Sequence, residues 1–306
     1  MTILSPVRNK PSHLAVVEEP KIQTKVPSYS PKTIACWSGS GSPGRTTLAI
    51  NLATELALSR KRILLIDLDT LSPAVGIALG LVDTPAGLSA VLRLAEQNRL
   101  TRSELSRLSV AIDVGRNELV FLPGISAASR WPEVSAERFE LLLAQISGQF
   151  DLIVLDLPQA TYPTTRLVHP ALSQVEERDD LIRSVLTRSS KLITISGCDA
   201  ISAKRFLEAQ SLLLELGRAD DQLVVVNRFR TSALGPDAKY ELEQSFQNLA
   251  NLRIDTFIPD EPENFDRALR NGLPLALLKR SSAARQAIKQ LADQILLSSA
   301  KGEWRG

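Results

Sequence analysis

A glycine-rich segment between a predicted strand and a predicted helix constrains this chain more than any other feature. The strand-like run 33–37 precedes it, and an apolar helical pattern begins at Leu48. The segment consists of Gly39, Ser40, Gly41, Ser42, Pro43, Gly44, Arg45, Thr46 and Thr47. Glycines let a backbone wrap closely around an anion, and a helix start points free N–H groups and its positive dipole end at that anion. The segment therefore predicts a phosphate-binding loop.

The spacing of this loop matches GxxxxGK[ST] at every fixed position except one, because Arg45 stands where lysine is expected. The planar arginine fork pairs with phosphate oxygens, but it is bulkier than an ammonium group and does not replace it freely. Pro43 has no N–H, so the loop offers one backbone donor fewer. Alone, the motif fits an ordinary glycine–serine turn as well as a phosphate-binding loop. Residues elsewhere in the chain are needed to distinguish the two.

Carboxylates follow two apolar strand patterns further along the chain. The run 63–67 ends in Asp67, with Asp69 two residues later, and the run 152–156 ends in Asp156. In doubly wound α/β proteins ligands bind outside the carboxyl ends of the strands, so these groups are expected to converge on the loop. A single aspartate at a strand end can be explained by solubility alone. Aspartates after two apolar strands, together with the glycine-rich loop, would seldom occur by chance.

Phosphoryl transfer requires a hydroxyl and a carboxylate around Mg²⁺, and a group that orients the attacking water. We assign Thr46, Asp67 and Asp156 to the metal. We assign Asp69 to the attacking water, and Arg45 to the phosphates as the second catalytic residue.

The hydrophobic pattern predicts one domain over 33–298, with an α/β fold in which helices cover both faces of a doubly wound, mostly parallel sheet, as in P-loop NTPases. Residues 1–32, with five prolines, are predicted to be a disordered tail, and 299–306 a short flexible tail. Predicted strands are 33–38, 63–67, 118–122, 152–156, 191–196, 222–227 and 252–258. Predicted helices are 45–59, 88–97, 101–108, 135–147, 199–216, 237–248, 261–271 and 281–298.

From about residue 33 to about 297 the chain resembles the ParA/MinD family of P-loop ATPases. Outside the loop the matching segments are 67–69 with Pro73, 80–81, 87–88, 156–158, 224–228, 257–260 with Ala268, and 272–274. The resemblance implies binding of ATP or ADP with Mg²⁺, a nucleotide-dependent homodimer, and loops after Asp69 and Asp156 that hydrolysis releases. It also implies that Asn227, together with Pro259 and Asp260, contacts adenine. For Asn227 a strand-terminating turn remains the alternative.

Within this family the segments 121–124 and 130–133 look most like the CpaE/TadZ branch of pilus-assembly loci. The family's signature lysine, which reaches the partner's nucleotide across the dimer, aligns with Ser40, and its second glycine aligns with Ser42. These departures predict slow hydrolysis. Related GTPases read guanine with a carboxylate in an [NT]KxD run, whereas Arg230 holds that position here, so ATP is expected to bind better than GTP.

The amino-acid composition limits which partners and which cellular compartment are expected for the chain. A formal net charge of +2 is too small to indicate nucleic acid. Acidic residues at 260–266 and at 293 flank the basic residues between 267 and 289, so this surface is mixed in charge, and DNA binding is possible but not favoured. The isolated His13 and His169, with Cys36 and Cys198 at apolar strand ends, do not form a metal pattern. No run is long enough for a membrane span, and the C-terminus lacks an amphipathic membrane helix, so no intrinsic membrane anchor is expected.

The sequence therefore predicts a cytoplasmic, ATP-binding, slowly hydrolysing switch protein that positions or regulates an assembly such as a pilus or the division machinery. A protein partner would recruit it to a pole, septum or membrane. One alternative is a pseudo-ATPase scaffold, which the substitutions at Ser40, Ser42, Pro43 and Arg45 favour. Another is a DNA-partitioning ATPase. A metabolic P-loop enzyme is disfavoured because no further substrate motif is apparent.

Overall fold

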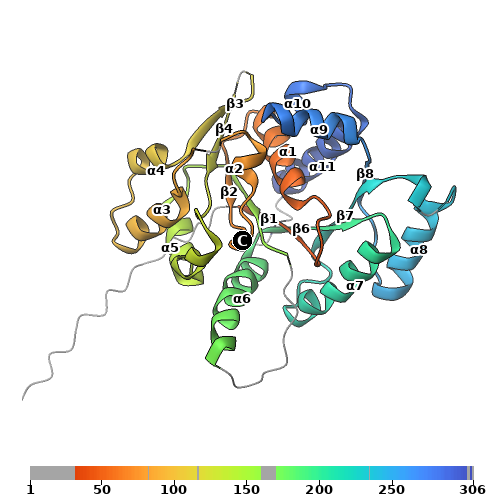
Figure 1. Ribbon diagram of the computed structural model, residues 1–306, viewed down its shortest axis with the longest axis horizontal. Coiled ribbons are helices and arrows are strands. Elements are labelled where there is room, and N and C mark those ends of the chain that lie inside the picture. The colour runs from red at the N-terminus through yellow and green to blue at the C-terminus, as the bar shows by residue number, and fades with distance from the viewer. Residues whose placement is uncertain are drawn as a thin grey trace, which may run out of the picture.

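A twisted sheet forms the centre of the computed structural model, which describes residues 32–81, 83–115, 117–159, 170–233, 235–301 and 304 (Figure 1). Within these residues eight strands lie in the order β3-β4-β2-β5-β1-β6-β7-β8. Among these described strands, β3 and β4 pair in antiparallel orientation and all other neighbours pair in parallel. The strands are β1 (Thr33–Ser38), β2 (Ile63–Asp67), β3 (Val110–Asp113), β4 (Glu118–Leu122), β5 (Leu152–Asp156), β6 (Lys191–Gly197), β7 (Gln222–Phe229) and β8 (Thr256–Pro259).

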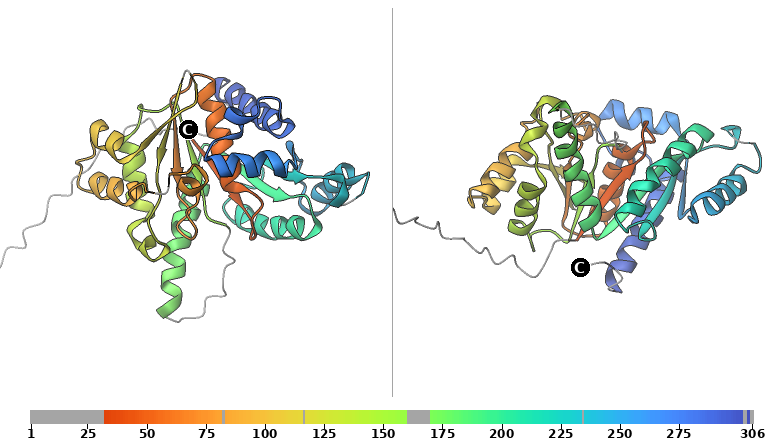
Figure 2. Two further views of the ribbon diagram at one scale, coloured as in Figure 1. Left: turned by 45° about the horizontal axis from the view of Figure 1, so that its top comes forward. Right: turned by 90° about the horizontal axis from the view of Figure 1, so that it is seen from below.

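Helices cover both faces of the sheet and give three layers (Figure 2). The core on one face contains residues of α1 and α11, and the core on the other face contains residues of α3, α5, α6 and α7. The helices are α1 (Arg45–Leu58), α2 (Val75–Ala78), α3 (Gly87–Glu96), α4 (Arg102–Leu108), α5 (Ala136–Gln145), α6 (Pro170–Arg188), α7 (Ala200–Glu215), α8 (Ala238–Ala250), α9 (Pro262–Asn271), α10 (Leu275–Leu278) and α11 (Ala283–Ala300). The predicted doubly wound α/β fold is confirmed.

The central strands are apolar along their whole length because both of their faces are covered. Alternate side chains of β1 point to opposite faces of the sheet. Ile34 and Cys36 lie in the core on the α1 side, while Ala35 and Trp37 lie in the core on the α7 side. Both cysteines are buried and free, as expected from their apolar surroundings.

Several predicted elements need correction. The last strand, β8, begins at Thr256 instead of residue 252, and the edge strand β3 was missed because it is short and only half-buried on alternate residues. The predicted helices include none between 147 and 199, although the charged run 176–180 was interpreted as a solvated helix face. Helix α6 occupies Pro170–Arg188 and buries Leu181 and Leu186. Residues 160–169, in the connection after Asp156 that was expected to respond to nucleotide, lie outside the described residues.

The two ends of the described domain meet beside α11. The Trp304 side chain is 9% exposed and belongs to the core on the α1 side. Its indole nitrogen donates to Ser298 Oγ at 2.9 Å, and the Lys32 ammonium lies 5.5 Å from the centre of its ring. A large indole contributes substantial buried apolar area, so this contact stabilises α11 on the sheet. Within the described part of the chain no helix is long and apolar enough to cross a membrane.

Candidate functional site

The glycine-rich loop joins the end of β1 to the start of α1, at the carboxyl edge of the sheet. Gly44 directly precedes the helix, and its φ of 93° lies in the left-handed region that favours glycine. A Cβ atom at this position would overlap the side-chain amide of Asn227. That amide nitrogen donates to the carbonyl oxygen of Pro43 at 2.7 Å. Gly44 is therefore needed both for the backbone turn and for the close approach of β7.

Thr46 and Asp156 meet directly behind the loop. Thr46 Oγ1 donates to Asp156 Oδ2 at 2.6 Å, and the other carboxylate oxygen of Asp156 is buried with no hydrogen-bond partner among the described residues. Burial raises the pKa of Asp156 to about 7, and the charge of Asp69 adds to this rise, while the Thr46 hydrogen bond and Arg45 oppose it. The site thus holds an acceptor oxygen that this chain itself does not satisfy.

Asp67 lies beside Asp156, because the two residues are register partners in the parallel pair of β2 and β5. Its oxygens accept backbone hydrogen bonds from Asp69 N at 3.2 Å and from Val75 N at 3.1 Å. Burial raises the pKa of Asp67, and the neighbouring Asp156 carboxylate raises it further. In this arrangement Asp67 ties the loop after β2 to the start of α2.

Arg45 and Asp69, the two predicted catalytic residues, form an ion pair. Arg45 Nη2 lies 3.1 Å from Asp69 Oδ2, and the side chains are 11% and 4% exposed. The guanidinium also donates to Ser38 Oγ at 2.9 Å. Asp69 Oδ1 accepts from the backbone N–H groups of Leu71 and Ser72, at 2.9 Å each. The pair therefore links the phosphate-binding loop to the loop that follows β2.

The predicted adenine-contacting residues lie at the carboxyl ends of β7 and β8. Asn227 is bound to the loop through Pro43. Asp260 N donates to Phe229 O at 3.0 Å, and the Asp260 carboxylate lies 3.4 Å from Arg230 Nη1. Pro259 pairs with Phe229 in the sheet. The structure thus places these residues at the adjoining ends of β7 and β8, and Asn227 contacts the loop.

Two side chains that accept hydrogen bonds from the loop were not predicted. Gln159 Oε1 accepts from Gly41 N at 3.2 Å, and Ser38 Oγ accepts from the Arg45 guanidinium at 2.9 Å. Gln159 lies three residues beyond Asp156 and Ser38 directly precedes the loop, so their positions in the sequence were the only available signal. Neither residue type identifies a phosphate site without a fold.

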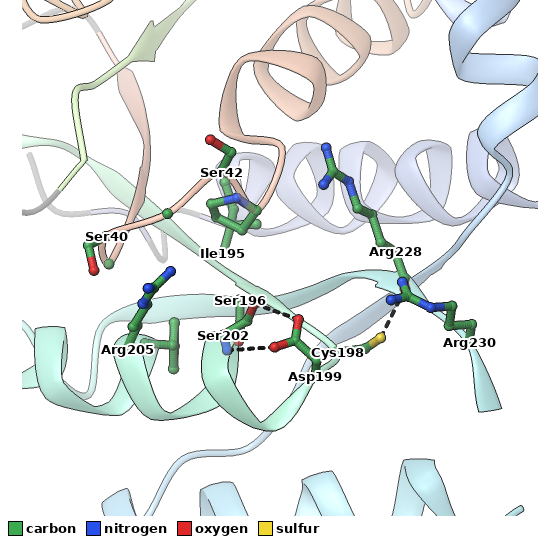
Figure 3. Close-up of a pocket in the computed structure, with 14 residues that line it drawn as sticks. Ser40, Ser42, Ile195, Ser196, Cys198, Asp199, Ser202, Arg205, Arg228 and Arg230 are labelled. Carbon is green, nitrogen blue, oxygen red and sulfur yellow. Dashed lines mark hydrogen bonds between the residues drawn. The ribbon is translucent and has the colours of Figure 1, made fainter. Parts of the chain in front are cut away.

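A pocket of about 130 Å³ lies beside the loop (Figure 3). Residues 39–43 form one wall, and the end of β6 with the start of α7 forms another. Arginines from α7 and from the end of β7 complete it, namely Arg205, Arg228 and Arg230. The pocket therefore combines loop backbone with positively charged side chains, which suits an anionic ligand.

The residues present fit a phosphate-bound Mg²⁺. Among the described residues no group of three or more His, Cys, Asp and Glu side chains is placed to hold a metal ion. Mg²⁺ usually takes one or two carboxylates together with substrate phosphates and water, and does not require such a cage. The Thr46 hydroxyl and the unsatisfied oxygen of Asp156 supply oxygen ligands of the required kind.

Replacing Asp156 with asparagine should stabilise the ligand-free protein at pH 8 by about 1–3 kcal/mol, because burial penalises the ionised carboxylate. The folded-state pKa of about 7 exceeds the unfolded value, so the native state retains a proton that the unfolded state has lost. The stability of the wild-type protein should therefore fall as pH rises from about 4 to 7, and the advantage of Asp156→Asn should shrink toward pH 4.

Urea unfolding between pH 4.5 and 8, without nucleotide, measures this difference at roughly half-unit steps of pH. Asp151→Asn is the control, because Arg62 lowers the pKa of that carboxyl and its substitution should destabilise the protein instead. An Asp156→Asn effect that did not change with pH would contradict the buried-carboxylate explanation.

Comparisons with known proteins agree with this geometry. The family described as the CobQ/CobB/MinD/ParA nucleotide binding domain matches residues 34–275. The septum site-determining protein MinD of Synechocystis is 23% identical over 264 residues, which cover 86% of this chain and 89% of that protein. An uncharacterized ATP-binding protein of Methanocaldococcus jannaschii is 21% identical over 263 residues, covering 86% and 87% of the two chains.

Solved structures share the fold. A ParA family ATPase from Chlorobium tepidum superposes with a TM-score of 0.66 at 15% identity, covering 85% of this chain and 98% of that one. MinD of Pyrococcus horikoshii, solved with Mg-ADP, gives a TM-score of 0.63 at 18% identity, covering 86% and 95%. These likenesses establish a P-loop NTPase fold. Since the family match spans most of its length, the chain belongs to the CobQ/CobB/MinD/ParA family of nucleotide-binding domains.

Proposed function

We propose that this chain binds ATP or ADP with Mg²⁺ and hydrolyses ATP slowly, as a switch protein of the ParA/MinD type. The observation that carries the proposal is the contact between Thr46 and Asp156, at 2.6 Å, behind a loop that opens onto the N-terminus of α1. The hydroxyl, the carboxylate and the loop N–H groups are the three components that a Mg²⁺-bound phosphate chain requires.

Each predicted residue receives a role in this proposal. Backbone N–H groups of the loop hold the phosphates. The loop residues that surround the phosphates are Gly39, Ser40, Gly41, Ser42, Gly44 and Thr47. Thr46 and Asp156 hold Mg²⁺, with Asp67 beside them, and the ion when bound neutralises charge on the phosphate oxygens. Asn227, Pro259 and Asp260 surround the base. Arg45 contacts the phosphates, and Asp69 orients the attacking water.

The ion pair between Arg45 and Asp69 suggests how nucleotide acts on the protein. Phosphate oxygens compete with Asp69 for the Arg45 guanidinium, because both are anionic acceptors. Once separated from Arg45, the Asp69 carboxylate becomes available to a water molecule. Asp69 also holds the backbone of Leu71 and Ser72, so nucleotide binding would reshape the loop after β2.

The output of such a switch would be a homodimer or a contact with a protein partner. We propose a CpaE/TadZ-like protein that positions or regulates an assembly such as a pilus or the division machinery, on the basis of segments 121–124 and 130–133. Relatives named for septum-site determination, and a MinC:MinD complex of similar fold, are consistent with a positioning role. A cytoplasmic location with recruitment through a partner fits this role.

A pseudo-ATPase scaffold is the second candidate, and one observation favours it. The cation of the loop, Arg45, is already neutralised by Asp69 and bound by Ser38. A third candidate, DNA partitioning, gains little support from the basic residues between 267 and 289. Two of these cations already form ion pairs, Arg285 with Glu55 and Lys289 with Asp293.

The base preference tests this proposal. Calorimetric titration with Mg²⁺ should show ATP and ADP binding more tightly than GTP and GDP, by about tenfold or more. Without a carboxylate to accept them, the N–H groups of guanine would be buried unpaired, and each unpaired donor costs ~1–3 kcal/mol. Arg230 stands where a guanine-reading carboxylate would be, and it pairs with Asp260. Arg230→Asp should reduce the ratio of ATP affinity to GTP affinity. GTP binding as tight as ATP in the wild-type protein would refute adenine recognition.

A further inference from the structure

Arg205 reaches the phosphate-binding loop from α7, a helix outside the predicted site. Its backbone packs against the loop, because a Cβ atom on Gly39 would lie 2.5 Å from Arg205 O. Its guanidinium Nη1 lies 3.1 Å from the place where a Cβ of Gly41 would be, and Gly41 has a φ of +103°. The close backbone contact holds α7 against the loop and brings the exposed Arg205 side chain within reach of Gly41.

The positive charge of Arg205 has no ion-pair partner within the part of the chain that the structure describes. The carboxylate of the same pocket, Asp199, is occupied at the start of α7, where it accepts from Ser202 N at 3.0 Å and from Ser202 Oγ at 2.7 Å. The preceding cation, Lys204, is paired with Glu208 instead. Arg205 thus brings uncompensated positive charge to an otherwise uncharged part of the loop.

The two ends of the loop face different neighbours (Figure 3). Asn227, the proposed base contact, binds at Pro43 and approaches Gly44. Arg205 lies at the other end, beside Ser40, while Arg228 and Arg230 lie away from it. Gly41 N at this end donates to Gln159, three residues beyond Asp156. A nucleotide with its base near Asn227 would therefore extend its last phosphate toward Gly41 and Arg205.

We propose that Arg205 contacts the terminal phosphate of a triphosphate bound by the same chain. This inference rests on the proposed nucleotide binding and adds to it a residue that distinguishes ATP from ADP. The arginine would supply, from within one chain, positive charge that Ser40 does not provide. A guanidinium donates two parallel hydrogen bonds to phosphate oxygens, so the contact is expected to be strong and dependent on geometry.

The test compares nucleotide affinities in three variants, by titration with Mg²⁺ and either ADP or a non-hydrolysable ATP analogue. Arg205→Ala should weaken binding of the analogue by about tenfold or more and leave ADP within about twofold, because a charge-assisted hydrogen bond to the last phosphate is lost. Arg205→Lys should retain part of the preference, since it keeps the charge without the fork. Lys204→Ala, which removes a neighbouring cation of the same helix, should change neither affinity.

Equal weakening of both nucleotides by Arg205→Ala would overturn the proposal, because it would indicate a general effect on charge or on the loop. Unchanged binding of the analogue would overturn it as well. The wild-type titrations separate this inference from the proposed function. A wild-type protein that binds both nucleotides, with no selective effect of Arg205→Ala, loses only the Arg205 contact. A wild-type protein that binds neither nucleotide loses both.

Discussion

Replacing Asp69 with asparagine is expected to lower the rate of ATP hydrolysis by a factor of about 10²–10³ or more, while ADP should bind at least as tightly because Arg45 is released from its ion pair. The carboxylate is the proposed acceptor for the attacking water, and an amide is a far weaker base. Asparagine retains a carbonyl oxygen for the backbone donors of Leu71 and Ser72, which bind Asp69 Oδ1 at 2.9 Å. The variant should therefore keep the loop after β2 folded and lose only the charge.

Single-turnover measurement of ADP formation, with protein in excess over ATP, gives this rate even when turnover is slow. Asp69→Ala removes the backbone contacts as well and separates the two roles of the side chain. Asp113→Ala serves as the control, because Asp113 is an exposed edge-strand residue that binds only the local Gly115 N–H among the described residues. Hydrolysis at the wild-type rate in Asp69→Asn would rule out the proposed role of the carboxylate.

Gly44→Ala is expected to reduce nucleotide affinity by about a hundredfold or more. An alanine at a φ of 93° is strained by ~1–2 kcal/mol, and its Cβ would in addition overlap the Asn227 amide. Relief of that overlap must move either the loop or the end of β7, and it breaks the hydrogen bond from Asn227 to Pro43. Both movements displace groups on which the phosphate and base contacts depend.

Calorimetric titration and urea unfolding together measure this effect. The matched control is Gly115→Ala, because Gly115 has a similar φ of +99° and no described atom lies within 4 Å of the position that a Cβ would take there. This control should lose about 1–2 kcal/mol of stability from strain alone and bind nucleotide normally. If Gly44→Ala bound nucleotide as the wild-type protein does, the loop would not be the binding site.

The parts of the site that the sequence predicted are those encoded locally. The glycine-rich loop lies between a strand and a helix, and Asp67 and Asp156 end apolar strands, so their convergence follows from the parallel sheet. The contacts that sequence analysis missed join distant segments. Arg205 meets the loop only because α7 packs against Gly39, and Gln159 meets Gly41 only through the fold.

The same distinction holds for the secondary structure. The buried central strands were predicted well because long apolar runs identify them. The edge strand β3 was missed, since its four residues alternate between half-buried and exposed and carry little periodic signal. The pairing of Arg45 with Asp69 was also beyond prediction, although both residues were singled out, because the loop and the end of β2 adopt their relative positions only in the folded sheet.

Equilibrium titration of the wild-type chain with ATP, first with Mg²⁺ and then with a chelator, tests the central claim most directly. The account predicts saturable binding at submillimolar ATP that weakens without Mg²⁺, because Thr46 and Asp156 are expected to hold the ion against the phosphates. No binding at millimolar ATP in the presence of Mg²⁺ would contradict the account and identify the chain as a scaffold that retains the fold without its ligand.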